Sequence, residues 1–125
     1  MTVQNRPIIN VFPTRIAAHR LRLGSLGEQL AADFLERRGL KILDRNVRIG
    51  RGEVDLIATD GKSRFVVEVK TGLETPDDHP RWNFTDRKAD QVLSMARRLG
   101  MRRVDLVTVA VREDGIRIDW SPRVI

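Results

Sequence analysis

The stretch from Arg51 to Lys70 constrains the fold most, because it places charged residues within a run that is otherwise apolar and rich in β-branched side chains. The pattern predicts two β-strands joined by a tight turn at Asp60-Gly61, the strongest short hairpin signal in the chain. A hairpin of this kind needs further strands or a helix to cover it. We therefore expect a fold built on a β-sheet around this pair.

Four charged residues of the two strands fall into two pairs. Glu53 and Asp55 lie two residues apart on the first strand, and Glu68 and Lys70 lie two residues apart on the second. Side chains at i and i+2 share a face of a strand, about 6.5 to 7 Å apart. Charged groups within an apolar strand are costly to bury unless they are paired, hydrogen-bonded or bound to an ion. This cost predicts a site where the two strands meet.

The rest of the chain supplies two helices and three more strands. Ser25, followed by Glu28, resembles a capping box and predicts a helix over residues 25–38. Thr85 or Asp86 is expected to cap a second helix, which Gly100 ends. Further strands are expected at residues 40–49, 104–111 and 116–120, and a long loop at 71–84.

This order of elements predicts an α/β fold with a mixed β-sheet of about five strands flanked by helices. Three consecutive strands form an antiparallel meander, and the second helix crosses over to a strand parallel to the last of them. Residues 1–20 are expected to be a flexible or loosely packed tail. Residues 21–125 are expected to form a single domain.

Charge and composition narrow the function classes. The 125-residue chain has 23 Lys and Arg against 17 Asp and Glu, a formal charge of +6, and no cysteine. Disulfides, thiolate catalysis and cysteine-based zinc sites are therefore excluded. No run is long and apolar enough to span a bilayer, and no secretion signal is present, so we expect a cytoplasmic protein. A basic surface suits a polyanion such as nucleic acid, although a merely basic soluble protein is the alternative.

The central strands carry ligands that suit a hard divalent cation. Mg²⁺ prefers oxygen ligands and usually binds one or two protein carboxylates, with water and substrate phosphate completing its octahedron. Asp55 and Glu68 could converge on one ion, with the carbonyl oxygen of Val69 as a third ligand. Lys70 would lie close to the bound water. It could orient that water, offset charge on the phosphoryl oxygens or act as a general base.

Each of these residues also has a structural interpretation. Glu68 and Lys70 could form an ion pair on an edge strand, and Asp55 could pair with Arg48 or Arg51. These alternatives require no metal and no catalysis.

Three residues outside the central strands also have structural interpretations. Glu28 is a helix-cap partner on local grounds. Trp82 and Phe84, in the long loop, could stack on a base, pack in the core or anchor the loop.

Several motifs taken together resemble a known family. The run LGSLGEQLAADFLERRGLKILDRNVRIGRGEVDLIATDGKSRFVVEVKTG, which begins at Leu23, contains G-E-x-x-A-A, I-L-x-R-N-x-R, G-E-V-D-L-I-A and V-E-V-K. It resembles the YraN family of small bacterial proteins. That family is similar to archaeal Holliday-junction resolvases and to restriction endonucleases of the PD-(D/E)xK superfamily. The resemblance covers most of the chain from about Leu21 and weakens over the final strand.

The resemblance implies a restriction-endonuclease-like, three-layer core and a nuclease site that uses Mg²⁺ or Mn²⁺. Asp55, Glu68 and Lys70 match the catalytic acid, acid and lysine of the superfamily. Glu28 matches a first-helix glutamate of the resolvase-like branch, which adds it to the catalytic candidates. Glu53 matches a family glutamate and is a possible auxiliary residue.

The function implied is hydrolysis of phosphodiester bonds in DNA, branched or otherwise structured. A single site of this size cuts one strand, so cleavage of both strands would require a homodimer. The alternatives are a catalytically inactive nucleic-acid-binding module of the same fold and a protein-interaction subunit. The basic residues expected to contact phosphate are Arg48, Arg51, Arg81, Arg87 and Lys88.

Overall fold

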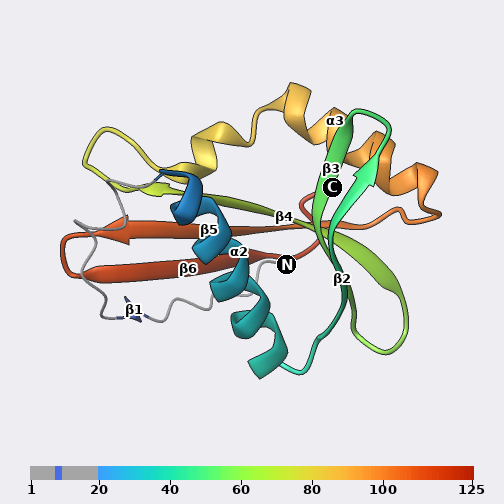
Figure 1. The fold of residues 1–125 in the computed structure, drawn as a ribbon, viewed down its shortest axis with the longest axis horizontal. Helices are drawn as coiled ribbons and strands as arrows, with labels where there is room; N and C mark the ends of the chain where they lie inside the picture. Colours follow the sequence, from blue (N-terminus) through green and yellow to red (C-terminus); the bar gives the residue numbers. More distant parts are fainter. Residues whose placement is uncertain (1–7, 10–19) are drawn as a thin grey trace.

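A mixed β-sheet lies between two α-helices in the computed structural model, which describes residues 8–9 and 20–125 (Figure 1). The six strands follow the order β1-β6-β5-β4-β3-β2. The α/β class and the three layers expected from the sequence are confirmed. The elements are β1 (Ile8–Ile9), α2 (Arg20–Arg37), β2 (Lys41–Ile49), β3 (Gly52–Thr59), β4 (Arg64–Leu73), the 3-10 helix η1 (Pro80–Asn83), α3 (Asp86–Arg98), β5 (Val104–Arg112) and β6 (Gly115–Ser121).

The strand connections agree with the predicted topology. Strands β2, β3 and β4 form the antiparallel meander, β5 pairs parallel to β4 after the α3 crossover, and β6 returns antiparallel to β5. Strand β1 was not predicted. It pairs antiparallel with β6 and falls within the expected tail. The rest of that tail lies outside the described residues, so the division at residue 20 stays a prediction.

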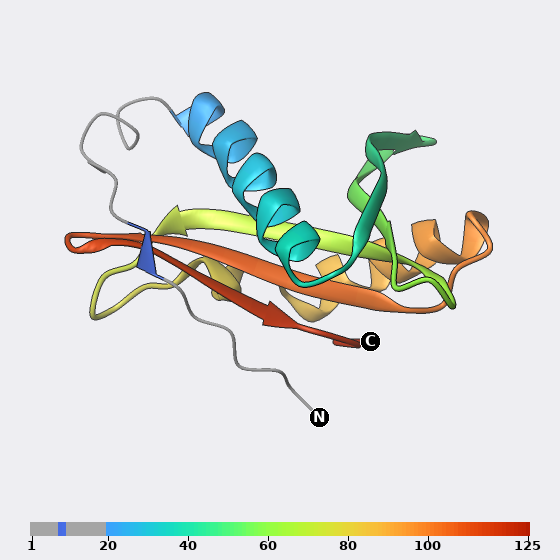
Figure 2. The same ribbon diagram turned by 90° about the horizontal axis from the view of Figure 1, so that it is seen from below.

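Two hydrophobic cores hold the layers together, one on each face of the sheet. Side chains alternate along β4, so Val67 and Val69 face the α2 core while Val66 faces the α3 core. Figure 2 shows the two helices on opposite sides of the sheet. A central strand that serves both cores has little tolerance for polar groups, yet β4 contains Glu68, which is buried.

The first helix begins earlier than its sequence signal indicates. Helix α2 starts at Arg20 rather than near Ser25, so Ser25 lies within the helix and the Ser25–Glu28 capping box is wrong. Leu23, in the early part of the helix, is buried in the α2 core. Tertiary packing therefore helps to stabilise this part of the helix.

The second helix and the loop before it are partly as expected. Thr85 is the N-cap of α3, and its Oγ1 accepts a hydrogen bond from the Lys88 N–H at 3.2 Å. The loop expected at residues 71–84 is shorter, because β4 continues to Leu73 and η1 occupies part of the remainder. The parallel pairing of β4 with β5 extends to the end of β4, which explains the longer strand.

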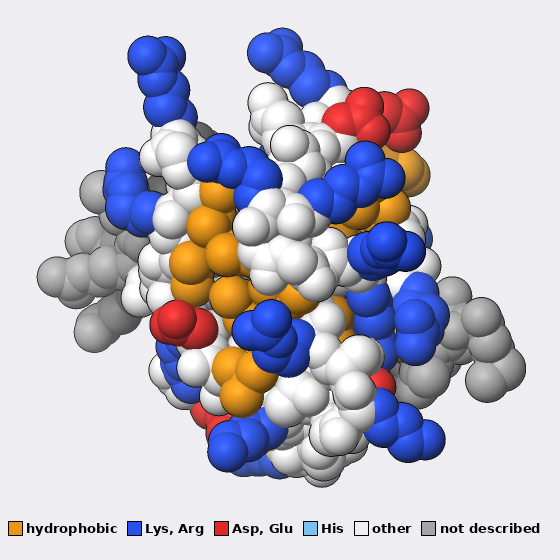
Figure 3. All heavy atoms as spheres, turned by 90° about the vertical axis from the view of Figure 1, so that its right-hand side faces the viewer, with side chains coloured by type: hydrophobic (Ala, Val, Ile, Leu, Met, Phe, Trp, Pro, Cys, Tyr) orange, Lys and Arg blue, Asp and Glu red, His pale blue; other side chains and the backbone are white. Residues whose placement is uncertain are grey.

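The surface is basic, as the composition indicates. Figure 3 shows one side of the molecule, on which Lys and Arg side chains outnumber carboxylates and surround exposed apolar groups. Neither described helix has the length and apolarity that a bilayer-spanning segment requires.

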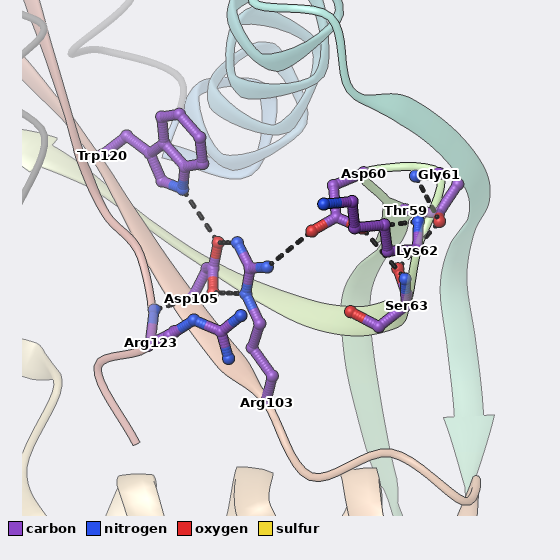
Figure 4. A network of polar contacts seen from close by, with 9 residues as sticks. All are labelled: Thr59, Asp60, Gly61, Lys62, Ser63, Arg103, Asp105, Trp120 and Arg123. Carbon is purple, nitrogen blue, oxygen red and sulfur yellow. Dashed lines mark hydrogen bonds and ion pairs between the residues drawn. The ribbon is translucent and has the colours of Figure 1, made fainter.

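A buried carboxylate joins the last two strands to the turn between β3 and β4 (Figure 4). Asp105 is fully buried and accepts four hydrogen bonds of 2.8 to 2.9 Å, two from the Arg103 guanidinium, one from Trp120 Nε1 and one from the Arg123 N–H. Arg103 Nη1 also contacts Asp60 Oδ2 at 3.2 Å. Both oxygens of Asp105 are therefore satisfied, and the network fixes this end of the sheet.

We expect Asp105→Ala to destabilise the protein by about 3 to 5 kcal/mol, because it leaves the Arg103 guanidinium partly buried without its partner. Urea denaturation measures the change. Asp114→Ala is the matched control, because it removes an exposed ion pair with Arg112 and should change stability by less than about 1 kcal/mol. Equal effects of the two substitutions would contradict this assignment.

Candidate active site

The hydrogen-bond ladder between β3 and β4 ends abruptly. The two strands pair from Thr59 and Arg64 to Leu56 and Val67, and no further pair follows. The first part of β3 continues to pair with β2 only. Figure 2 shows the β2–β3 hairpin rising from the sheet on the side of α2. The strands therefore separate at the position where the sequence places Asp55.

Asp55 occupies the place that the next strand pair would have taken. Its Oδ2 accepts a hydrogen bond of 2.8 Å from the Val69 N–H, so a carboxylate replaces a backbone acceptor. The N–H and C=O of one strand residue point to the same side. The carbonyl of Val69 is therefore directed toward this same gap between β3 and β4.

Glu68 is the buried member of the site, with 2% of its side chain exposed. Its Oε2 contacts Lys70 Nζ at 3.1 Å and Lys88 Nζ at 3.5 Å. Its Oε1 is buried and has no hydrogen-bond partner among the described residues. The interpretation of Glu68 and Lys70 as an ion pair on an edge strand is wrong, because β4 lies between β3 and β5.

The two carboxyl groups interact directly. Burial, a hydrogen bond to Glu68 and the charge of Glu68 raise the pKa of Asp55 to about 8, with a smaller contribution from Glu28, while the Val69 N–H opposes the shift. Two carboxylates that share a poorly solvated site cannot both ionise at low cost. Without a cation, the Asp55–Glu68 pair therefore retains a proton to a higher pH than an ordinary carboxyl group does. Its alternative pairing with Arg48 or Arg51 is not found among the described ion pairs.

A second pair of acids lies beside the first and is joined by Asn46. Its Nδ2 donates to Glu28 Oε1 at 2.8 Å and to Glu53 Oε1 at 2.9 Å. Asn46 has a φ of 52°, a conformation that Asn tolerates better than most residues. The amide thus links α2 to β3 at the mouth of the gap. Glu28 has this role in place of the helix-cap role expected from local sequence.

Helix α2 can reach this site because Gly27 allows close packing. A Cβ atom at Gly27 would overlap Thr71 Oγ1 on β4. The absence of a side chain brings the helix against the strand one residue before Glu28. In the sequence, the glycine at position 27 is the signal for this close contact between α2 and β4.

The basic residues expected to contact phosphate divide into two groups. Arg48, Arg51, Arg81 and Arg87 are exposed, as such contacts require, but no observation tests them further. Lys88 instead contacts Glu68 and belongs to the site. From the sequence, Lys88 is predicted only as a phosphate contact, and its contact with Glu68 is not predicted. Its spacing of four residues from buried Val92 was the signal that it points inward.

The aromatic residues of the loop have different environments. The Trp82 side chain is 66% exposed, so packing in the core is wrong for this residue. Phe84 packs against the α3 core, which agrees with a structural interpretation. Stacking of Trp82 on a base stays a prediction.

The donor set fits a divalent cation that is completed by water and substrate. Asp55 and Glu68 offer hard oxygen atoms, and the unpartnered Oε1 of Glu68 is the kind of buried acceptor that a cation satisfies. Within residues 8–9 and 20–125, no group of three or more Asp, Glu or His side chains is arranged to hold an ion. Protein carboxylates alone would therefore supply at most two ligands here.

Comparison with known proteins establishes the family. Residues 27–109 match the model of a family described as "Uncharacterised protein family UPF0102". The chain belongs to this family. The predicted resemblance to the YraN family, which is the same family, is confirmed. The match extends from α2 to β5 and includes all four acids of the site.

The relatives share the description UPF0102 protein, which states no activity. One from Renibacterium salmoninarum is 46% identical over 77 residues, 62% of this chain and 65% of its own length. One from Syntrophotalea carbinolica is 39% identical over 111 residues, 82% of this chain and 90% of its own length. A solved structure, "The structure of Pyrococcus Furiosus SfsA in complex with Ca2+", has 14% identity and a TM-score of 0.35, and covers 82% of this chain and 63% of that chain.

We expect the stability of the metal-free protein to fall as pH rises from about 4 to about 8, because folding raises the pKa of Asp55 above its ordinary value. The native state keeps a proton that the unfolded chain releases. This contribution is fully present below about pH 4 and is lost as pH passes the folded pKa. The slope is at most about 1.4 kcal/mol per pH unit and is reduced by solvent screening, since Asp55 is half-buried.

Urea denaturation in EDTA across this pH range measures the effect. Asp55→Asn should flatten the pH dependence, whereas Asp77→Asn, in an exposed loop, should leave it unchanged. A slope that is the same in wild type and Asp55→Asn would contradict the raised pKa.

The conformation of Asn46 gives a second prediction. Asn46→Gly and Asn46→Ala both remove the bridge between Glu28 and Glu53, but only alanine is strained at a positive φ. We expect the alanine variant to be less stable than the glycine variant by about 1 kcal/mol in urea denaturation. Alanine at least as stable as glycine would mean that the backbone relaxes at this position.

Proposed function

We propose that this UPF0102 protein is a divalent-metal-dependent nuclease that hydrolyses phosphodiester bonds of DNA at the gap between β3 and β4. The observation that carries the proposal is the pair of acids where the β3–β4 ladder ends: Asp55 bonds the Val69 N–H there, and Glu68 beside it contacts two lysines. Two acids in direct contact at a poorly solvated site lower the free energy of unfolding. Such a cost supports the proposal that the acids serve a function.

Asp55 and Glu68 are the residues that would hold Mg²⁺ or Mn²⁺, with the Val69 carbonyl as a further ligand. The metal would supply charge neutralisation at the scissile phosphate and a more acidic bound water. A bound cation also removes the reason for Asp55 to keep its proton, because it favours the ionised form of both acids. Glu28, linked through Asn46, would act through water at the edge of the site.

The two lysines would have different roles in the site. Lys70 is closer to Glu68 and is the candidate for positioning the attacking water. Lys88 reaches the same oxygen from α3 and has one-third of its side chain exposed, so it can contact both Glu68 and a phosphate at the mouth of the site. Together they would offset the charge of Glu68 and limit the build-up of negative charge on the phosphoryl oxygens.

DNA is the substrate class that charge favours. The formal charge is +6, and Arg48, Arg51, Arg81 and Arg87 are exposed. Branched or otherwise structured DNA is part of the proposal through the resemblance to junction resolvases. Cleavage of both strands would need two copies of the chain.

An inactive nucleic-acid-binding module is the second candidate, and one observation favours it. Lys70 and Lys88 already neutralise Glu68 without a metal, so the cluster could be a structural ion network. Such a module would bind DNA in a salt-sensitive way that EDTA does not change.

We expect wild-type protein to cleave linear, nicked, flapped or four-way DNA in the presence of Mg²⁺ or Mn²⁺, and not in EDTA. Asp55→Asn, Glu68→Gln and Lys70→Ala should each lower the cleavage rate about a hundredfold or more. Asp77→Asn and Lys62→Ala change exposed residues in turns outside the strands of the site, so they are the matched controls and should retain activity. Gel electrophoresis of labelled strands measures the rate.

Calorimetric titration with Mn²⁺ tests the metal separately from activity. Wild type should bind and release a proton, and Asp55→Asn should lose binding. Equal cleavage by wild type and the site variants would rule out the catalytic assignment. Metal-independent DNA binding without strand scission would establish the second candidate instead.

A further inference from the structure

A groove lies at the C-terminal end of α3, on the side of the molecule drawn in Figure 3. It encloses about 580 Å³ and is lined by Leu93, Arg97, Gly100, Met101, Arg102 and Ile125. We call it the α3 groove. A second hollow of about 490 Å³ shares Leu93 and Arg97 and adds Asp90, Ser94 and Arg98. Each of the two volumes is within the range that bound ligands occupy.

The α3 groove is distinct from the candidate active site. Lys88 and Arg97 are nine residues apart on one helix, which corresponds to about 14 Å along the axis and about half a turn around it. Lys88 points toward Glu68, so Arg97 points to the opposite side of α3. The groove therefore does not depend on the proposed nuclease chemistry.

The arginines at the groove have no acidic partner within the described part of the chain. Arg97, Arg98 and Arg102 are exposed, and none takes part in the ion pairs of residues 20–125. Arg103, the next residue, uses its guanidinium fully on Asp105 and Asp60. Arg112 likewise contacts two carboxylates, Glu74 and Asp114. The cations at the α3 groove are thus available for an external anion.

The apolar lining indicates what kind of anion fits. Met101 is buried, Leu93 is half-buried and Ile125 is 37% exposed. No aromatic side chain is among the lining residues, so a nucleic-acid base would lack the stacking partner that it usually finds. Arginine forks bind carboxylates in a bidentate way, and Arg and Met are enriched at protein interfaces. This favours a peptide over a nucleic acid.

We propose that the α3 groove is a protein-interaction site that binds an acidic peptide segment with an apolar side chain at its centre. The apolar side chain fills the space between Leu93, Met101 and Ile125. Carboxylates on either side of it pair with Arg97 and Arg102, and Arg98 extends the basic rim. Asp90, at the far end of the adjoining hollow, sets the limit of the region that accepts negative charge.

The probe is a pool of short, fluorescently labelled acidic peptides that have Leu, Ile, Phe or Trp at the centre. A matched pool has Gly at the centre, and a single-stranded DNA oligonucleotide of equal charge is the competitor. Fluorescence anisotropy gives the affinity, and NMR chemical-shift mapping gives the location. We expect the apolar pool to bind about tenfold more tightly than the Gly pool, with shifts at Leu93, Met101 and Ile125.

Arg97→Glu combined with Arg102→Glu should weaken peptide binding about tenfold or more. The control is Arg37→Glu combined with Lys41→Glu, which changes net charge equally at exposed positions elsewhere and should retain binding. Both variants should keep the metal-dependent cleavage rate on DNA, if that activity is present, which separates this proposal from the proposed function.

Three results would overturn the proposal. The first is no difference between the apolar and Gly pools, or no binding of either. The second is equal loss of binding in the two variants, which would indicate a response to net charge alone. The third is competition by the oligonucleotide with shifts at the same residues, which would make the α3 groove a nucleic-acid contact.

Discussion

The site depends on where the β3–β4 ladder stops. If the strands continued to pair beyond Leu56 and Val67, a backbone carbonyl of β3 would accept the Val69 N–H, and Asp55 would be one more side chain on a sheet. Because the strands separate, a buried N–H is left that needs an acceptor, and the Asp55 carboxylate provides it. The same separation places Asp55 against Glu68. One break in a hydrogen-bond ladder thus fixes the position of the acids and shifts the pKa of one of them.

Two buried acids of this sheet differ in how fully their oxygen atoms are hydrogen-bonded. Asp105 and Glu68 lie on neighbouring strands, and Asp105 is opposite Val67, the residue before Glu68. Asp105 accepts four hydrogen bonds and has no capacity left. Glu68 has a buried Oε1 that no N–H group of the described residues reaches, which lowers stability but leaves a position for a ligand or for the Asp55 proton. A fold that required only stability would favour the first arrangement at both positions.

The sequence predicts the regular parts of this structure well. Alternation along β4 places Val67 and Val69 on one face and Glu68 on the other, because a central strand follows period 2 without interruption. Asp60-Gly61 marks the hairpin for a purely local reason. The family resemblance is also confirmed, since it rests on motifs spread over most of the chain.

The parts that sequence reasoning missed depend on distant contacts. The spacing of Lys88 from Val92 indicates that it points inward, but its contact with Glu68 depends on how the preceding loop places α3 against β4. The bridge from Asn46 depends on a bulge in β2 near Leu43 and on a positive φ at Asn46. Neither feature follows from the hydrophobic periodicity of the sequence. The early start of α2 depends on burial of Leu23 in the core. In each case, tertiary packing overrides a local signal.

Helix α3 connects these observations, because its faces lie in different environments. One face packs Val92 and Met95 against the sheet and extends to Lys88 at the acids, while the opposite face presents Arg97 to solvent. A helix is stiff over this length, so the packed face fixes both positions at once. Substitution at Arg97 changes no contact that holds α3 in place, whereas substitution at Val92 would displace Lys88. Charge on the outer face is therefore free to serve a partner without disturbing the site at the other end of the helix.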